Sequence, residues 1–209
     1  QVINIYAGTN ENKELSNFAE RPFTYNGVKF KTVEHAFQYA KKKYFNSYSI
    51  DPASNVTPQD LQKKLDARFD KILNAKTPAE ARKLGKARIG IDFENKFWDQ
   101  ESSKVMKDLI KNSFEQNPDA LQKILETGNA TLTHTQDKSK WGKLFPTILM
   151  EVREELREKD SKESNQLDPN TLFQDLIDDA DYDLSFSLVP QEGAAQPEIP
   201  FEAAEEELK

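Results

Sequence analysis

Apolar and polar positions follow two different periods in the first 158 residues. Residues 2–6, VINIY, and residues 23–30, FTYNGVKF, carry the short-period pattern of β-strands. In the second segment, Asn26-Gly27 stands between two β-prone arms, and an Asn-Gly pair at such a place is typical of a type I′ turn. The pattern therefore predicts an N-terminal strand followed by a β-hairpin.

Helical spacing of apolar residues dominates the rest of this region. Thr57 with Pro58 marks one helix start, and Thr77 with Glu80 forms the capping-box pattern at another. We expect helices over residues 33–44, 57–75, 77–88, about 103–116, 117–128 and 147–159, and a strand over 130–134. The fold class predicted is α+β, a predominantly helical single domain with a small antiparallel sheet.

Composition suits one medium-sized core, with 209 residues, 36% hydrophobic and 31% charged. No apolar run approaches the roughly 20 residues of a membrane span, and no secretion signal is recognisable, so a cytoplasmic protein without a membrane partner is expected. The chain has no cysteine and only two histidines, which excludes thiolate chemistry and makes a metal or other cofactor unexpected. Because it begins at Gln1, we expect it to be part of a larger multidomain protein.

The formal charge of −7 is the average of two unlike regions. Residues 159–209 hold 14 acidic residues against 3 lysines, and residues 1–158 carry a net charge of +4. The acidic part is rich in proline and has little to bury, apart from a short apolar segment at 172–177. It is therefore predicted to be a largely disordered tail or linker.

Glu34 is the first residue to suggest chemistry. A glutamate near a helix N-terminus complements the helix dipole by roughly 0.3–1 kcal/mol, which is sufficient reason for its presence. However, Glu34, Gln38 and Lys41 are spaced to share one helix face, different from the apolar face of Val33 and Phe37. A polar face of this kind can line a site.

Five segments then occur in a recognisable order: residues 14–45 (ELSNF to KKKYF), ARKLGKAR, FW, HTQDKSKWG and ILMEVREEL. In this order and spacing the chain, over roughly residues 2–158, resembles the NADAR family of N-glycosidases. The resemblance implies hydrolysis of the C–N bond between a ribose and a nitrogen base. Substrates implied are phosphorylated riboflavin-pathway intermediates or ADP-ribose attached to a nucleobase, and nucleic acid stays open as a partner.

The resemblance also implies roles for particular residues. Glu34 is the expected catalytic carboxylate, because an oxocarbenium-like state needs negative charge near the anomeric carbon. Asp137 is expected to assist departure of the base, with the alternatives of His35 and Gln38. The remaining contacts expected with substrate are Ser16, Asn17 and Phe18 for ribose or phosphate, Lys86 and Arg88 for phosphate, and Trp98 and Trp141 for stacking.

Plainer explanations stand beside these roles. Ser16 and Asn17 are common turn residues, Lys86 and Arg88 are ordinary solvated charges, and a lone tryptophan usually packs. Many relatives have a glycine-rich loop after Trp-Gly, whereas here Trp141-Gly142 leads through KLFP directly to the last helix. The alternative function is therefore a non-catalytic module that binds an ADP-ribose-like ligand or modified nucleic acid.

Overall fold

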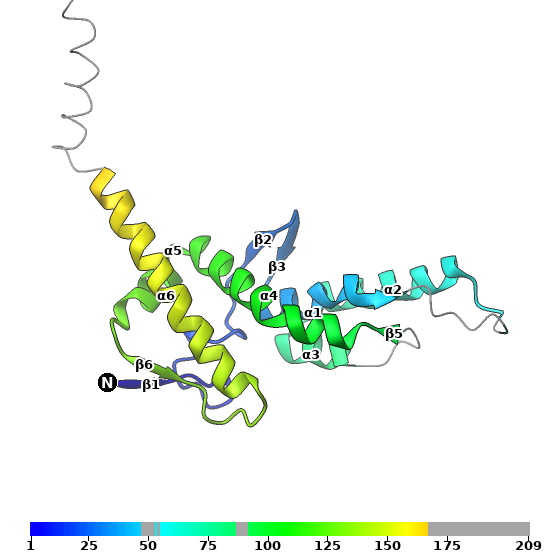
Figure 1. Ribbon diagram of the computed structural model, residues 1–209, viewed down its shortest axis with the longest axis horizontal. Helices are drawn as coiled ribbons and strands as arrows, with labels where there is room; N and C mark the ends of the chain where they lie inside the picture. The colour runs from blue at the N-terminus through cyan, green and yellow to red at the C-terminus, as the bar shows by residue number, and fades with distance from the viewer. Residues whose placement is uncertain (47–52, 54, 87–91, 167–209) are drawn as a thin grey trace, which may run out of the picture. The chain divides into compact units, whose positions relative to one another are not determined.

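The computed structural model describes residues 1–46, 53, 55–86 and 92–166 (Figure 1). Contacts between Cα atoms divide the chain into two units, residues 1–161 and residues 162–209. Of the second unit, only residues 162–166 are described, and they are the exposed end of the last helix. The predicted disorder of the acidic tail, its apolar segment at 172–177 and the predicted helix end at 87–88 lie outside the described residues.

Helices make up most of the described fold, and short strands connect them (Figure 1). The α-helices are α1 Val33–Ala40, α2 Pro58–Leu73, α3 Pro78–Lys86, α4 Asn95–Glu115, α5 Pro118–Glu126 and α6 Trp141–Gln166. The strands are β1 Val2–Asn4, β2 Phe23–Tyr25, β3 Val28–Phe30, β4 Phe45–Asn46, β5 Asp92–Phe93 and β6 Thr131–Thr133. Three 3-10 helices complete the set, namely η1 Ala7–Thr9, η2 Lys13–Leu15 and η3 Lys41–Tyr44.

The described strands pair as three two-stranded ladders. The β2–β3 ladder is the predicted antiparallel hairpin, and Asn26 (φ 49°) and Gly27 (φ 78°) both have the positive φ of a type I′ turn. A second antiparallel ladder joins β4 to β5, while β1 pairs with β6 in parallel from Val2 opposite Thr131. The prediction of a predominantly helical α+β fold with a small antiparallel sheet is confirmed.

Local signals explain most helix starts. The Thr57 side chain accepts a hydrogen bond from the Asp60 amide and the Asp60 carboxylate reaches back to the Thr57 amide, so the capping box is complete. Thr77 likewise accepts from the Glu80 amide, but the Glu80 carboxylate accepts from the Lys76 amide, one residue earlier than the motif predicts.

Several helix boundaries differ from the sequence prediction, among them the end of the last helix, which lies at Gln166 and not at residue 159. The first helix changes from α to 3-10 geometry at Lys41 instead of continuing to Tyr44. Helix α4 begins at Asn95, eight residues early, because its first turns are polar on the surface and give no apolar period. Helix α6 begins at Trp141 and contains Pro146. Because proline is unfavourable inside a helix, the sequence predicts a start after this residue.

One apolar core spans α1, α4, α5 and α6 and includes Phe37, Leu109, Phe114 and Leu149, while a smaller cluster around Phe69 and Ile72 lies between α2 and α3. Ion pairs join α4 to α6 at the surface, where the Lys107 and Lys111 ammonium groups lie 2.7 and 3.0 Å from Glu155. In the described part of the chain, no helix combines the length and the apolar character needed to cross a bilayer. The packing fixes α1 between α2, α3 and α4, which is where the candidate site lies.

Candidate active site

Glu34 is placed by the start of α1. Thr32 caps this helix, since its hydroxyl accepts from the His35 amide. The Glu34 amide, free at the helix end, donates to the Asn17 carbonyl at 3.1 Å. This bond holds the segment at residues 16–18 against the first turn of α1. Only 3% of Glu34 is exposed, so its carboxylate is removed from bulk water.

The Glu34 carboxylate has two side-chain partners. Its Oε1 accepts from Gln38 Nε2 at 2.9 Å and from Arg82 Nε at 3.1 Å. Arg82 comes from α3, and 44% of its side chain is exposed although it bonds to a buried group. Its guanidinium also lies 5.1 Å from the centre of the Phe18 ring. Arg82 therefore covers Glu34 on the solvent side and is the residue that must move for Glu34 to meet a ligand.

Gly85 allows α3 to approach α1 this closely. A Cβ atom at position 85 would overlap the Gln38 side chain, with its amide oxygen as the nearest atom. The backbone at Gly85 needs no left-handed conformation, so close approach alone explains the glycine. Any larger residue would push Gln38 away from Glu34.

Cationic groups surround this carboxylate. Lys41, at the end of α1, has its ammonium group 6.0 Å from the Phe37 ring centre and 5.9 Å from that of Trp98. Burial lowers the pKa of Lys41 to about 8, Glu34 opposes this shift, and the charges of Lys86 and Arg82 add to it. Lys86 is exposed, as a phosphate contact should be, whereas Arg88 lies outside the described residues.

Two amide oxygens near Glu34 lack partners. Asn17 Oδ1 and Gln38 Oε1 are buried and accept no hydrogen bond, although both residues hold Glu34 by other atoms. Asn17 Nδ2 has only the Met106 sulfur, at 3.3 Å. Buried acceptors without donors are costly and usually bind water or a ligand.

Asp137 lies in the loop before α6. Its Oδ1 accepts from the Ser139 amide at 2.8 Å and hydroxyl at 2.6 Å, and its Oδ2 is 3.7 Å from His134 Nε2. Burial acts to raise the pKa of Asp137, but the Ser139 hydrogen bonds and the charges of His134 and Arg82 together lower it. Asp137 is thus held ionised, a state in which it can accept a hydrogen bond from a base but has no proton to donate, and its expected role in departure of the base stays a prediction. Since Arg82 influences both acids, Asp137 belongs to the surroundings of Glu34.

Several residues expected at the site have their polar atoms occupied by the fold. His35 Nε2 donates to the Ala75 carbonyl at 2.9 Å, so its Nδ1 accepts from Thr32 at 2.8 Å and no ring nitrogen is left for a ligand. Ser16 Oγ accepts from the Phe18 amide at 3.1 Å, as in a turn. These geometries agree with the plainer explanations, and a contact of His35 or Ser16 with substrate stays untested.

The two tryptophans flank Phe37. Trp98 is 8% exposed and its ring centre is 5.0 Å from that of Phe37 and 5.1 Å from that of Tyr44. Trp141 meets Phe37 edge-on at 5.3 Å and is half-buried. Packing is therefore the visible role of Trp98, whereas Trp141 keeps an accessible surface. Stacking of either ring on a ligand stays a prediction.

One member of the site is not evident from the sequence. Helical spacing places Lys41 on the Glu34 face, but nothing distinguishes Arg82 within ARKLGKAR. Its partner is 48 positions away, a distance that no local period encodes. Among the described residues, no group of three or more histidine or acidic side chains is arranged to hold a metal ion.

The chain combines a predominantly helical α+β fold with a buried, arginine-covered glutamate, and its similarity to known proteins supports a glycosidase family. Residues 5–157 match the NADAR domain, and the chain belongs to the NADAR family. It is similar to N-glycosidase YbiA of Escherichia coli (strain K12) and of Shigella flexneri, each 27% identical over 165 residues, covering 74% of this chain and 88% of theirs. The NMR structure of the E. coli protein YbiA superposes with a TM-score of 0.56 at 26% identity, covering 77% of this chain and 87% of that one.

Proposed function

We propose that this protein hydrolyses the C–N bond between a phosphorylated ribose and a nitrogen base. The observation that carries the proposal is the Glu34 carboxylate, 3% exposed and held by Gln38 and Arg82. Removal of a carboxylate from water costs free energy unless the charge is paired. A buried anion also stabilises developing positive charge far better than a solvated one. The chain's similarity to the YbiA N-glycosidases supports the same reaction.

Glu34 has two tasks in this reaction. Its negative charge stabilises the oxocarbenium-like state at the anomeric carbon as the C–N bond breaks. It then accepts a proton from the water whose oxygen bonds to that carbon. Lys41 donates a proton to the departing nitrogen, because its pKa of about 8 suits proton transfer near neutral pH. The products are a free ribose hydroxyl and the protonated base.

The neighbouring polar groups fit the two ends of a ribose phosphate. The unpartnered Asn17 Oδ1 accepts from a sugar hydroxyl. Lys86, exposed and close enough to Lys41 to affect its pKa, meets the phosphate. These contacts support phosphorylated riboflavin-pathway intermediates and ADP-ribosylated nucleobases as the substrates to examine first.

Arg82 gives the site a way to open. Its side chain is 44% exposed, so rotation into solvent uncovers Glu34 without disturbing the core. Once Arg82 has moved and the C–N bond begins to break, the positive charge that develops at the anomeric carbon takes the place of the guanidinium beside the carboxylate.

Glu34→Gln tests the assignment, because it keeps the side chain's shape and removes its charge. Release of free base from both substrate classes, followed by mass spectrometry, should fall by about 100-fold or more, with substrate binding retained. Glu34→Asp, which withdraws the carboxylate by one methylene, should lose less. Parental turnover in Glu34→Gln would reject catalysis through this residue, and saturable binding without turnover in the parent protein would favour the binding module instead.

A further inference from the structure

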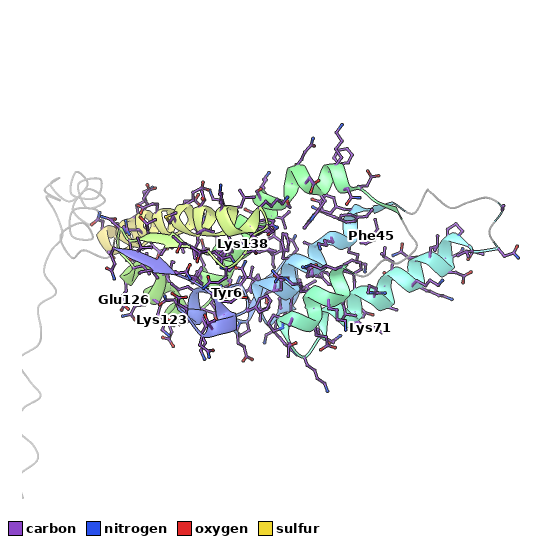
Figure 2. The ribbon with its side chains drawn as sticks, turned by 90° about the horizontal axis from the view of Figure 1, so that it is seen from below. Tyr6, Phe45, Lys71, Lys123, Glu126 and Lys138 are labelled. Carbon is purple, nitrogen blue, oxygen red and sulfur yellow. The ribbon has the colours of Figure 1, made fainter. Side chains whose placement is uncertain are left out.

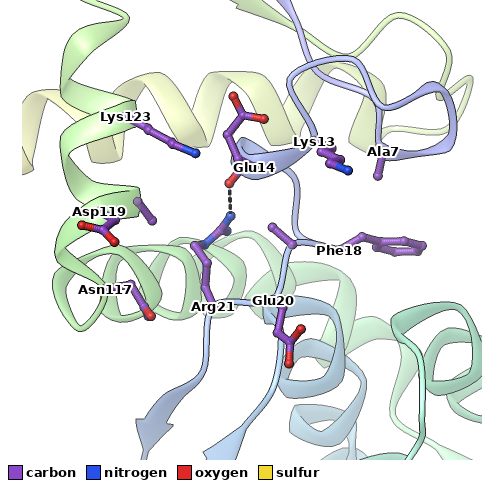
Figure 3. Close-up of a pocket in the computed structure, with 11 residues that line it drawn as sticks. Ala7, Lys13, Glu14, Phe18, Glu20, Arg21, Asn117, Asp119 and Lys123 are labelled. Atoms are coloured by element: carbon purple, nitrogen blue, oxygen red, sulfur yellow. Dashed lines mark hydrogen bonds between the residues drawn. The ribbon is translucent and has the colours of Figure 1, made fainter.

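A polar hollow lies between α5 and the segment that carries η2, away from Glu34 (Figure 3). It encloses about 500 Å³ and is not lined by Glu34, Gln38 or Lys41. Its charged and aromatic lining residues are Lys13, Glu14, Phe18, Arg21, Asp119 and Lys123, together with Glu20. We call it the Arg21 pocket.

Arg21 is a buried cation without a counter-charge. It is 3% exposed, and its Nε donates to Ser113 Oγ at 3.0 Å while Nη1 donates to the Glu14 and Ser16 carbonyls at 2.7 and 2.9 Å. Nη2 has no partner, and the guanidinium lies 4.3 Å from the Phe114 ring centre. All these partners are neutral. Burial lowers the pKa of Arg21 to about 10, so the group still carries its full charge at neutral pH.

The start of α5 adds further positive potential to the pocket. Asn117 precedes this helix but does not cap it, because its side chain donates instead to the Pro22 and Ser113 carbonyls. The first-turn amides therefore lack a side-chain acceptor, and Asp119 carries one of them. In Figure 3 the Asp119 carboxylate points away from the middle of the pocket, whereas the Lys123 side chain reaches toward it.

We propose that the Arg21 pocket binds a phosphate group. A phosphate supplies the acceptor oxygens that the α5 amides and Lys123 lack, and it neutralises the charge of Arg21 beneath them. The acidic side chains of Glu14 and Glu20 do not prevent this binding. In Figure 3 the Glu20 carboxylate points away from the pocket, and Arg21 donates to the main-chain oxygen of Glu14 and not to its carboxylate. This binding requires no catalysis and goes beyond the proposed function.

Phe18 connects the pocket to the Glu34 site. Phe18 lines the Arg21 pocket, and its ring, which in Figure 3 points away from Arg21 and Lys123, lies 5.1 Å from the Arg82 guanidinium. The phosphate can accordingly come from two sources, a free phosphorylated molecule or the far end of an ADP-ribosyl substrate whose ribose is at Glu34. Both present the same chemistry to Arg21 and Lys123.

Three lysine-to-alanine variants of the full chain test the site, with inorganic pyrophosphate as the probe and isothermal titration as the measurement. Lys123→Ala should weaken binding about tenfold, the loss expected for one hydrogen bond to a charged group. Lys71→Ala is the matched control, since Lys71 is an exposed lysine at the other end of the folded unit (Figure 2), and it should bind as the parent does. Lys86→Ala reports separately on pyrophosphate that binds beside Glu34, where Lys86 is proposed to meet the substrate's phosphate.

Two results would overturn the proposal. One is the absence of saturable pyrophosphate binding in the parent protein. The other is weakened binding in Lys86→Ala together with normal binding in Lys123→Ala, which would place pyrophosphate beside Glu34. Because the titration involves no turnover, its outcome is independent of whether the glycosidase proposal holds.

The source of the phosphate follows from a second comparison. An ADP-ribosylated nucleoside is titrated into Glu34→Gln and into Glu34→Gln with Lys123→Ala. A tenfold weaker affinity in the double variant assigns the pocket to the substrate's distal phosphate. Equal affinities, together with weakened pyrophosphate binding in Lys123→Ala, assign it to a separate phosphorylated ligand.

Discussion

Gly85→Ala should change how the Glu34 carboxylate is held in place without removing its charge. The new methyl group would overlap Gln38, and a buried side chain that must move costs about 1–3 kcal/mol. Alanine recovers about 1 kcal/mol through its higher helix propensity. The net loss of about 1 kcal/mol should lower Tm by about 2–4 °C, a small change for a fold of this size.

The effect on turnover should be larger than the effect on stability. The displaced Gln38 no longer donates to Glu34, and loss of a hydrogen bond to a charged group, about 1.5–3 kcal/mol, corresponds to roughly 10- to 100-fold in rate. Base release and thermal unfolding are measured on the same samples. Gln38→Ala should show the same loss of rate.

A double variant provides the decisive control for this reasoning. With Gln38→Ala in place, only the Cβ atom of residue 38 remains close to the new methyl group, so Gly85→Ala should then cost less stability than it does alone, while turnover stays low. The argument fails if Gly85→Ala alone keeps the parental rate with a raised Tm. That result would mean that Gln38 has another rotamer available that still holds Glu34.

Two shorter predictions concern pH and the end of the fold. Lys41, with its pKa lowered to about 8, loses its proton as pH rises, so kcat should fall above pH 8, and Lys41→Arg, which cannot donate a proton, should be slow at every pH. The unfolded chain holds that proton more tightly, so the stability contributed by Lys41 rises between pH 8 and about 10, and Lys41→Met should abolish this rise in urea titrations. Truncation after Lys159 should leave Tm and turnover unchanged, since Leu156 is the last buried residue of α6, and a loss of several degrees would show that the acidic segment docks on the fold.

The elements that the sequence predicts well are those with local causes. The Asn26-Gly27 turn and the Thr57 cap depend on residues within four positions of one another, and both occur as expected. The start of α4 was missed because Phe97 is exposed and the residues around Trp98 have no apolar repeat. The first turn of α4 is fixed by its packing against distant parts of the chain, and no pattern among neighbouring residues predicts it.

The site was predictable in part for the same reason. The polar face of Glu34 and Gln38 follows from helical spacing within α1. The cover supplied by Arg82 and the lowered pKa of Lys41 depend on α3, which packs on α1 only after both helices have formed. A sequence pattern can therefore indicate the carboxylate, whereas its partners can be identified only from the folded structure.

Asn17 offers a test in which stability and function should change in opposite directions. Its Oδ1 is buried without a donor, a deficit of about 1–3 kcal/mol, and the weak contact of Nδ2 with Met106 returns little of it. Asn17→Leu keeps the size of the side chain and removes the unpaired acceptor, and the main-chain bond to Glu34 does not depend on the side chain. The free protein should gain about 1 kcal/mol, or about 2–4 °C in Tm.

The same variant should bind substrate less well, because the ribose hydroxyl that pairs with Oδ1 loses its acceptor. A neutral hydrogen bond of about 1 kcal/mol corresponds to a rise in KM of about fivefold, with kcat nearly unchanged if the contact is the same in the ground and transition states. A turn residue with no ligand would give the opposite result, a lower Tm and an unaltered KM. Asn17→Leu would then show that the unpaired oxygen is a cost of the turn, and the ribose would have to be held by other groups around Glu34.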